Sequence, residues 1–88
     1  MRLYIGLMQC TDGEDYSHLV VGRTEQERDA EMLDHVEAIM ESGSIEWDPP
    51  KDGKNAKELN DRFCEAHGEW SFAGWVYDLE RQTGWPSD

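Results

Sequence analysis

The sequence is poor in basic and in aliphatic residues. Lysine and arginine number 8 against 20 aspartates and glutamates, which gives a formal net charge of −12. This shortage excludes nucleic acid and anionic membrane as direct ligands, because both require a positively charged surface. Leu, Ile, Val and Phe together make only 15 of the 88 residues, a share at which high charge begins to indicate disorder. Four Trp, three Tyr and four Met compensate, so we expect one small folded domain over residues 1–88 with an aromatic and Met-rich core.

Long apolar runs and abundant cysteines are also absent. No stretch approaches the ~18 apolar residues of a membrane span, and the N-terminus lacks the charged and apolar regions of a signal peptide. We therefore expect a cytoplasmic protein that makes no membrane contact. The two cysteines, Cys10 and Cys64, are then expected to be free thiols.

Alternation of polarity predicts strands at both ends of the chain. Residues 2–9 and 18–22 form a β-hairpin with an eight-residue connection, and Leu3, Ile5 and Leu7 share one face of its first strand. Residues 70–81 fit either a strand or a helix. The strand is preferred, because a lone hairpin is barely stable and a third strand completes a sheet.

Two capping signals predict two helices between these strands. The pattern Thr24-Glu25-Gln26-Glu27 begins a helix that ends at Gly43, and Asn55 with Glu58 begins a shorter helix that ends at Gly68. Residues 42–54 contain Pro49-Pro50 and indicate a loop. The apolar stripe of the first helix is Met32, Leu33, Val36, Ile39 and Met40, and that of the second is Ala56, Leu59, Phe63 and Ala66.

These elements predict an α+β fold in the order ββααβ. A three-stranded antiparallel sheet, built from residues 2–9, 18–22 and 70–80, carries both helices on one face. We expect the apolar stripes of the helices to cover Leu3, Ile5 and Leu7.

Carboxylates follow one another at helical spacing on the outer side of both predicted helices. Residues three and four apart on a helix are neighbours about 5–6 Å apart, so each pair of like charges costs a few tenths of a kcal/mol. Glu37 and Glu41 also lie where the helix dipole favours a cation. The first row is Glu27, Glu31, Asp34, Glu37 and Glu41, the second is Glu58, Asp61 and Glu65, and the hairpin loop adds Asp12, Glu14 and Asp15.

Three explanations of these rows remain open at this point. Charge runs are usually solvated surfaces, and an acidic chain with only three lysines also suits a high-salt environment. The functional explanation is that carboxylates about 6 Å apart imitate the successive phosphates of one nucleic-acid strand. A groove lined by Lys and Arg would accept such a surface and bind it quickly through electrostatic steering.

The patterns Glu27-x-x-x-Glu31-x-x-Asp34 and Glu58-x-x-Asp61-x-x-x-Glu65, in a short acidic chain, resemble the small inhibitors encoded by phages and other mobile elements. These include anti-CRISPR and anti-restriction proteins, some of which are described as DNA mimics. The resemblance is one of overall character and rests on no shared motif, so no family residue is carried over. It implies non-enzymatic blocking of the basic, nucleic-acid-binding surface of a target protein, for example a CRISPR effector complex or a restriction enzyme.

Catalytic and cofactor motifs are missing. The chain has no G-x-S-x-G, no H-E-x-x-H and no phosphate-binding glycine loop, and we expect neither an enzyme nor a cofactor. Cys64 and His67 have the spacing of two metal ligands, but a structural zinc site needs four, so we expect no metal.

The alternative function is an interaction or regulatory module, as a homodimer or an assembly factor, that uses an apolar patch. One candidate patch is the sheet face with Tyr4 and Met8. The other is Trp47, which either anchors a partner or folds back to cover the small core.

Overall fold

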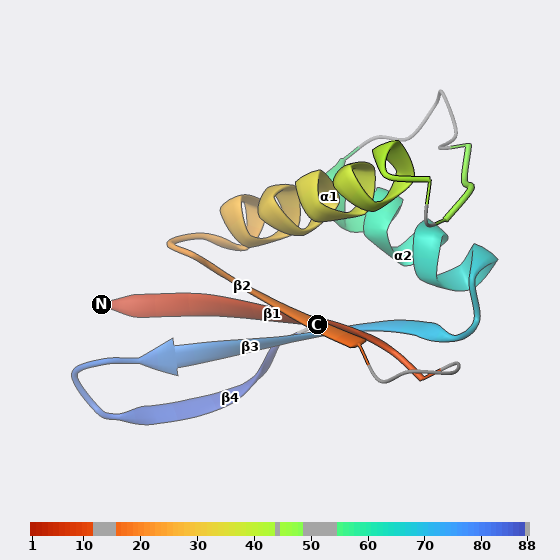
Figure 1. Ribbon diagram of the computed structural model, residues 1–88. Coiled ribbons are helices and arrows are strands. Elements are labelled where there is room, and N and C mark those ends of the chain that lie inside the picture. Colours follow the sequence, from red (N-terminus) through yellow and green to blue (C-terminus); the bar gives the residue numbers. More distant parts are fainter. Residues whose placement is uncertain (12–15, 44, 49–54, 88) are drawn as a thin grey trace.

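The computed structural model of the protein describes residues 1–11, 16–43, 45–48 and 55–87, which form a two-layer α+β unit (Figure 1). The elements are β1 (Arg2–Cys10), β2 (Tyr16–Gly22), α1 (Glu25–Glu41), α2 (Ala56–Ala66), β3 (Trp70–Asp78) and β4 (Thr83–Ser87). The strands form one antiparallel sheet in the order β2-β1-β3-β4. Both helices lie on the same face of this sheet, with α1 over β2 and β1 and α2 over β3.

The α+β class and the positions of both helices are confirmed. The side chain of Thr24 accepts a hydrogen bond from the backbone N–H of Glu27 at 3.1 Å, and that of Asn55 accepts one from Glu58 at 2.9 Å. These are the two predicted helix starts. Residues 70–78 form a strand, as preferred, because they complete the sheet beside β1.

The predicted number of strands is wrong, because the chain turns after β3 and adds β4. The carboxylate of Asp78 accepts the backbone N–H groups of Glu80 and Arg81 at 3.0 and 3.3 Å, and Gln82 adopts a left-handed φ of 53°. These features make a tight turn back onto β3. The returning strand contains Pro86, which an edge strand tolerates because its outer side needs no ladder hydrogen bond.

The predicted identity of the covered sheet face is also wrong. The core joins Met8 of β1 and Val20 of β2 to the helices, so the even-numbered side chains of β1 point at α1 and α2. Leu3, Ile5 and Leu7 lie on the opposite, uncovered face. Both faces of β1 are apolar, and an alternating pattern cannot tell which of them a distant helix will cover. The rest of the core cluster is Met32, Val36, Phe63 and Trp70.

A buried arginine explains how α1 fits the sheet. Arg28 is 2% exposed, and its guanidinium contacts the Asp29 carboxylate at 3.0 Å and donates to the Ser87 hydroxyl at 2.9 Å. It lies over Gly6 and Gly74, which pair across β1 and β3. A Cβ atom on Gly74 would stand 2.5 Å from an Arg28 guanidinium nitrogen. The glycine pair thus leaves the space that this side chain occupies.

Candidate protein-binding surfaces

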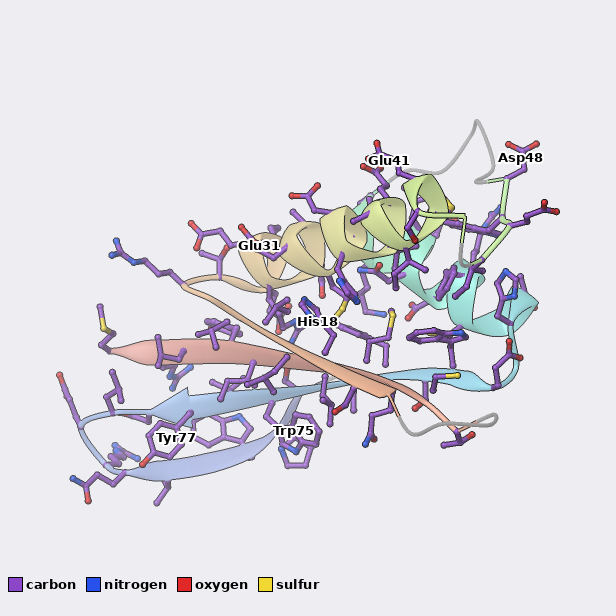
Figure 2. All side chains as sticks on the ribbon, in the orientation of Figure 1. His18, Glu31, Glu41, Asp48, Trp75 and Tyr77 are labelled. Carbon is purple, nitrogen blue, oxygen red and sulfur yellow. The ribbon has the colours of Figure 1, made fainter. Side chains whose placement is uncertain are left out.

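The carboxylates of α1 form a continuous outer surface. All five side chains are exposed, and Figure 2 shows Glu31 and Glu41 on the outside of α1. We call this surface the acidic helix face. Its members, all exposed, are Glu27, Glu31, Asp34, Glu37 and Glu41.

Glu27 has a structural reason to be at its position. Its carboxylate accepts the backbone N–H of Arg23 at 2.8 Å, and its own N–H is bound by the Thr24 side chain. It also lies in the first turn, where the helix dipole favours negative charge. Glu27 therefore contributes to the start of α1 as well as to the acidic helix face.

The other four carboxylates have no such role. No basic side chain in the described part of the chain forms an ion pair with Glu31, Asp34, Glu37 or Glu41. The last turn of α1 carries no basic residue that would offset the negative end of the helix dipole. These residues therefore present unneutralised charge at a cost to their own helix.

The acidic helix face continues past the end of α1. Glu46 and Asp48 are exposed in the segment that follows the helix, and Asp48 lies on the same outer side as Glu41 (Figure 2). Sequence reasoning did not include these two residues, because a loop has no periodicity from which a direction can be inferred.

The row on α2 differs from the row on α1, because most of it is neutralised. Asp61 pairs with Lys57 and Glu58 pairs with Arg62, each at 3.0 Å and one helical turn apart. Glu65 is exposed and forms no ion pair with any residue that the structure describes. The second row therefore adds less negative charge than its composition indicates.

The remaining predicted binding residues have different locations. Asp12, Glu14 and Asp15 lie outside the described residues. Trp47 is half-buried, and its ring meets that of Phe63 edge to face at a centroid distance of 5.4 Å. It packs against the hydrophobic core, which is the second of the two roles expected for it.

The uncovered side of the sheet is an apolar surface without charge, which we call the open sheet face. Leu19 is 59% and Val21 is 48% exposed, and Figure 2 shows Trp75 and Tyr77 on the side of the sheet opposite the helices. The strand register places the following residues on this face: Leu3, Ile5, Leu7, Gln9, Ser17, Leu19, Val21, Ser71, Ala73, Trp75, Tyr77, Gly84 and Pro86. None of them is Asp, Glu, Lys, Arg or His, although the chain holds 20 carboxylates.

Histidine and cysteine side chains lie mainly between the two layers. His18 of β2 and His35 of α1 stack with ring centroids 3.5 Å apart, and burial followed by the nearby His18 lowers the pKa of His35. Burial, with a smaller effect of Asp61, raises the pKa of the Cys64 thiol to about 11, so it stays protonated at neutral pH. Within the described ranges no three His, Cys, Asp or Glu side chains are grouped to hold a metal ion.

No protein-family model matches the chain, and no curated protein or solved structure shows significant similarity to it. Among the residues that the structure describes, no helix has both the length and the apolar character needed to cross a membrane. The functional proposal therefore rests on the chemistry of the two outer surfaces.

Proposed function

We propose that the protein is a non-enzymatic inhibitor that occupies the basic, nucleic-acid-binding surface of a target protein through its acidic helix face. The target would be a CRISPR effector complex, a restriction enzyme or another protein with a Lys- and Arg-lined groove. In this proposal the protein acts in the cytoplasm of a bacterial host and is encoded by a phage or mobile element.

The observation that carries the proposal is that no cation among the described residues pairs with Glu31, Asp34, Glu37 or Glu41. Adjacent members are about 5–6 Å apart on the helix, a separation comparable to that of phosphates along one strand. Soluble surfaces usually carry both signs of charge interspersed, as on α2. On α1, four successive members of the row lack such compensation from the described residues, which suits a partner that supplies the cations.

Competition with DNA tests this proposal directly. The immobilised protein is exposed to a bacterial lysate at low salt, and captured proteins are challenged with duplex DNA. An inhibitor that replaces nucleic acid releases its target to DNA, and the released protein binds DNA itself. The double variant Glu31→Lys with Asp34→Lys should capture at least about 100-fold less of that target, because two attractive contacts become repulsive.

A matched control separates position from net charge. Glu69→Lys with Glu80→Lys makes the same change in charge away from α1, and it should reduce capture only slightly. Equal losses in both double variants would show that net charge alone acts, and a target that DNA does not displace would contradict the proposal. If high-salt adaptation is the reason for the acidity, the protein instead requires molar salt to fold, which circular dichroism at low salt reveals.

The alternative of an interaction module has support from a different observation. The open sheet face is apolar and uncharged, so it fits a partner surface that the acidic helix face does not. The patch predicted around Tyr4 and Met8 is replaced by this face, because Met8 is fully buried under the helices.

A further inference from the structure

We infer that the open sheet face is the interface of a symmetric dimer, in which it packs against the same face of a second copy of this chain. The pairing does not depend on the proposed function. It follows from the composition of the face, its area and the position of the charges relative to it.

The composition of the face is that of an interface with an apolar centre and a polar edge. Across the strands, Ile5 lies between Val21 and Trp75, and Leu7 lies between Leu19 and Ala73. At one end the row of Ser17, Gln9 and Ser71 is polar but uncharged. An apolar centre with a polar rim is typical of surfaces that bind protein, and the largest apolar patch of a protein is often functional.

The area is at the lower limit for a specific pair. Strands of nine, seven, nine and five residues, each residue covering about 3.3 Å by about 4.8 Å of sheet, give a footprint of roughly 480 Å² per copy. Two copies then bury about 1,000 Å², since protruding side chains add to the planar value. This reaches the size at which a specific interface becomes plausible.

Charge favours a second copy over a basic partner. The face offers no carboxylate to a cation, whereas two such faces meet without burying any charge. With the sheets back to back, the two α1 helices lie on opposite outer sides, separated by three layer spacings of about 10 Å each. That distance exceeds the Debye length of about 8 Å at physiological salt several-fold, so repulsion between the acidic helix faces is mostly screened.

The hydrophobic core of a single copy is small, which favours additional burial of apolar surface in a dimer. Its fully or nearly buried apolar side chains are few: Met8, Val20, Met32, Val36, Phe63, Trp70 and Val76. Chains only slightly shorter than this one commonly need a disulfide, a metal or a second copy for stability. Cys10 and Cys64 form no disulfide, so a disulfide does not provide that stability. The dimer would display two acidic helix faces, each open to a target.

Sedimentation equilibrium of the whole chain tests the pairing. We expect a mass of twice the 10.2 kDa of one chain at micromolar to submillimolar concentrations. Leu19→Lys should raise the dimer dissociation constant by about 100-fold or more, since each dimer would bury two unpaired charges. Leu19→Thr keeps the β propensity, removes most of the apolar area and should weaken the dimer less. Added NaCl should strengthen the wild-type dimer, because it screens two chains of −12 each.

The matched control is Ala38→Lys, which makes the same change in charge at an exposed position of α1 and should leave the dimer intact. Circular dichroism shows whether each variant is folded. A wild-type mass of 10.2 kDa throughout overturns the inference and assigns the face to a different protein. A folded Leu19→Lys variant that dimerises like the wild type also overturns the inference. Oligomers of more than two copies that form as the concentration rises do so as well.

Discussion

The two outer surfaces of the protein differ in almost every property that decides binding. The acidic helix face carries exposed carboxylates, whereas the open sheet face carries apolar side chains and no charge. Salt should weaken contacts made by the first and strengthen contacts made by the second. The comparison teaches that the open sheet face carries none of the charge behind the net value of −12.

A buried ion pair lies in the layer between the two surfaces. Arg28 reaches from α1 onto the sheet and is held by Asp29 and Ser87, so a charged side chain lies where an apolar one is usual. Burial raises the pKa of the Asp29 carboxyl, and the adjacent guanidinium opposes that rise. Removing one partner of such a pair leaves a buried charge, so the contact is important for where α1 lies even if its net contribution is small.

The largest effect on stability is expected from a change in this layer. Gly74→Val places a side chain 2.5 Å from Arg28 and 2.7 Å from the Ser87 carbonyl oxygen, and β4 or α1 must shift. We expect urea unfolding to show a loss of about 2–3 kcal/mol at a fixed protein concentration. Gly68→Ala is the control, because a Cβ there meets nothing within 4 Å. Equal stability of the two variants would show that the glycine pair does not position Arg28.

Local signals predicted most of the secondary structure, but not how the layers meet. The caps at Thr24 and Asn55 and the alternation in residues 2–9 act over a few residues, so the sequence displays them directly. The burial of Arg28 depends on two glycines that are distant in the chain, Gly6 and Gly74. The strand β4 was missed because Gly84 and Pro86 are typical of a turn, and only its place at the sheet edge permits them.

The candidate surfaces were predictable to different degrees. Helical spacing alone placed Glu31, Asp34 and Glu41 on one exposed face. It could not show that Glu58 and Asp61 are neutralised, although Lys57 and Arg62 at a spacing of four residues were the available signal. The open sheet face was not identified, because its residues have the composition of a core.

Substitution of one carboxylate on each helix should change stability by a smaller amount, and in opposite directions on α1 and α2. Glu41→Lys removes a repulsive carboxylate from the last turn of α1 and adds a cation there, so we expect the free energy of unfolding to rise by about 0.3–1 kcal/mol. Asp61→Asn breaks the ion pair with Lys57 on α2 and should lower it by about 0.3–0.5 kcal/mol. Urea titration of each variant at low salt measures both changes. If Glu41→Lys is destabilising, the carboxylates of α1 do not oppose the stability of their helix.

The smallest effect is expected from pH. It tests the stacked pair of His18 and His35 between β2 and α1. The pKa of His35 is lowered in the folded protein, so below its ordinary value of 6.5 the unfolded chain binds more protons there. This contribution to stability is complete above pH 6.5 and is lost as the pH falls below that value. His35→Gln cannot titrate. The difference in unfolding free energy between wild type and variant should therefore shrink as the pH falls from about 7 to about 5. A constant difference would show that His35 titrates normally.

The central claim is that the acidic helix face binds the target as nucleic acid does, and the salt dependence of that binding tests it most directly. If four carboxylates take the place of four strand phosphates, the affinity for the captured target should fall by up to roughly 50-fold between about 50 mM and about 200 mM NaCl. The variant Glu31→Lys with Asp34→Lys should show little binding and little slope. An affinity that changes less than about two-fold over the same range of salt would contradict the claim, because binding through four exposed charges cannot be insensitive to screening.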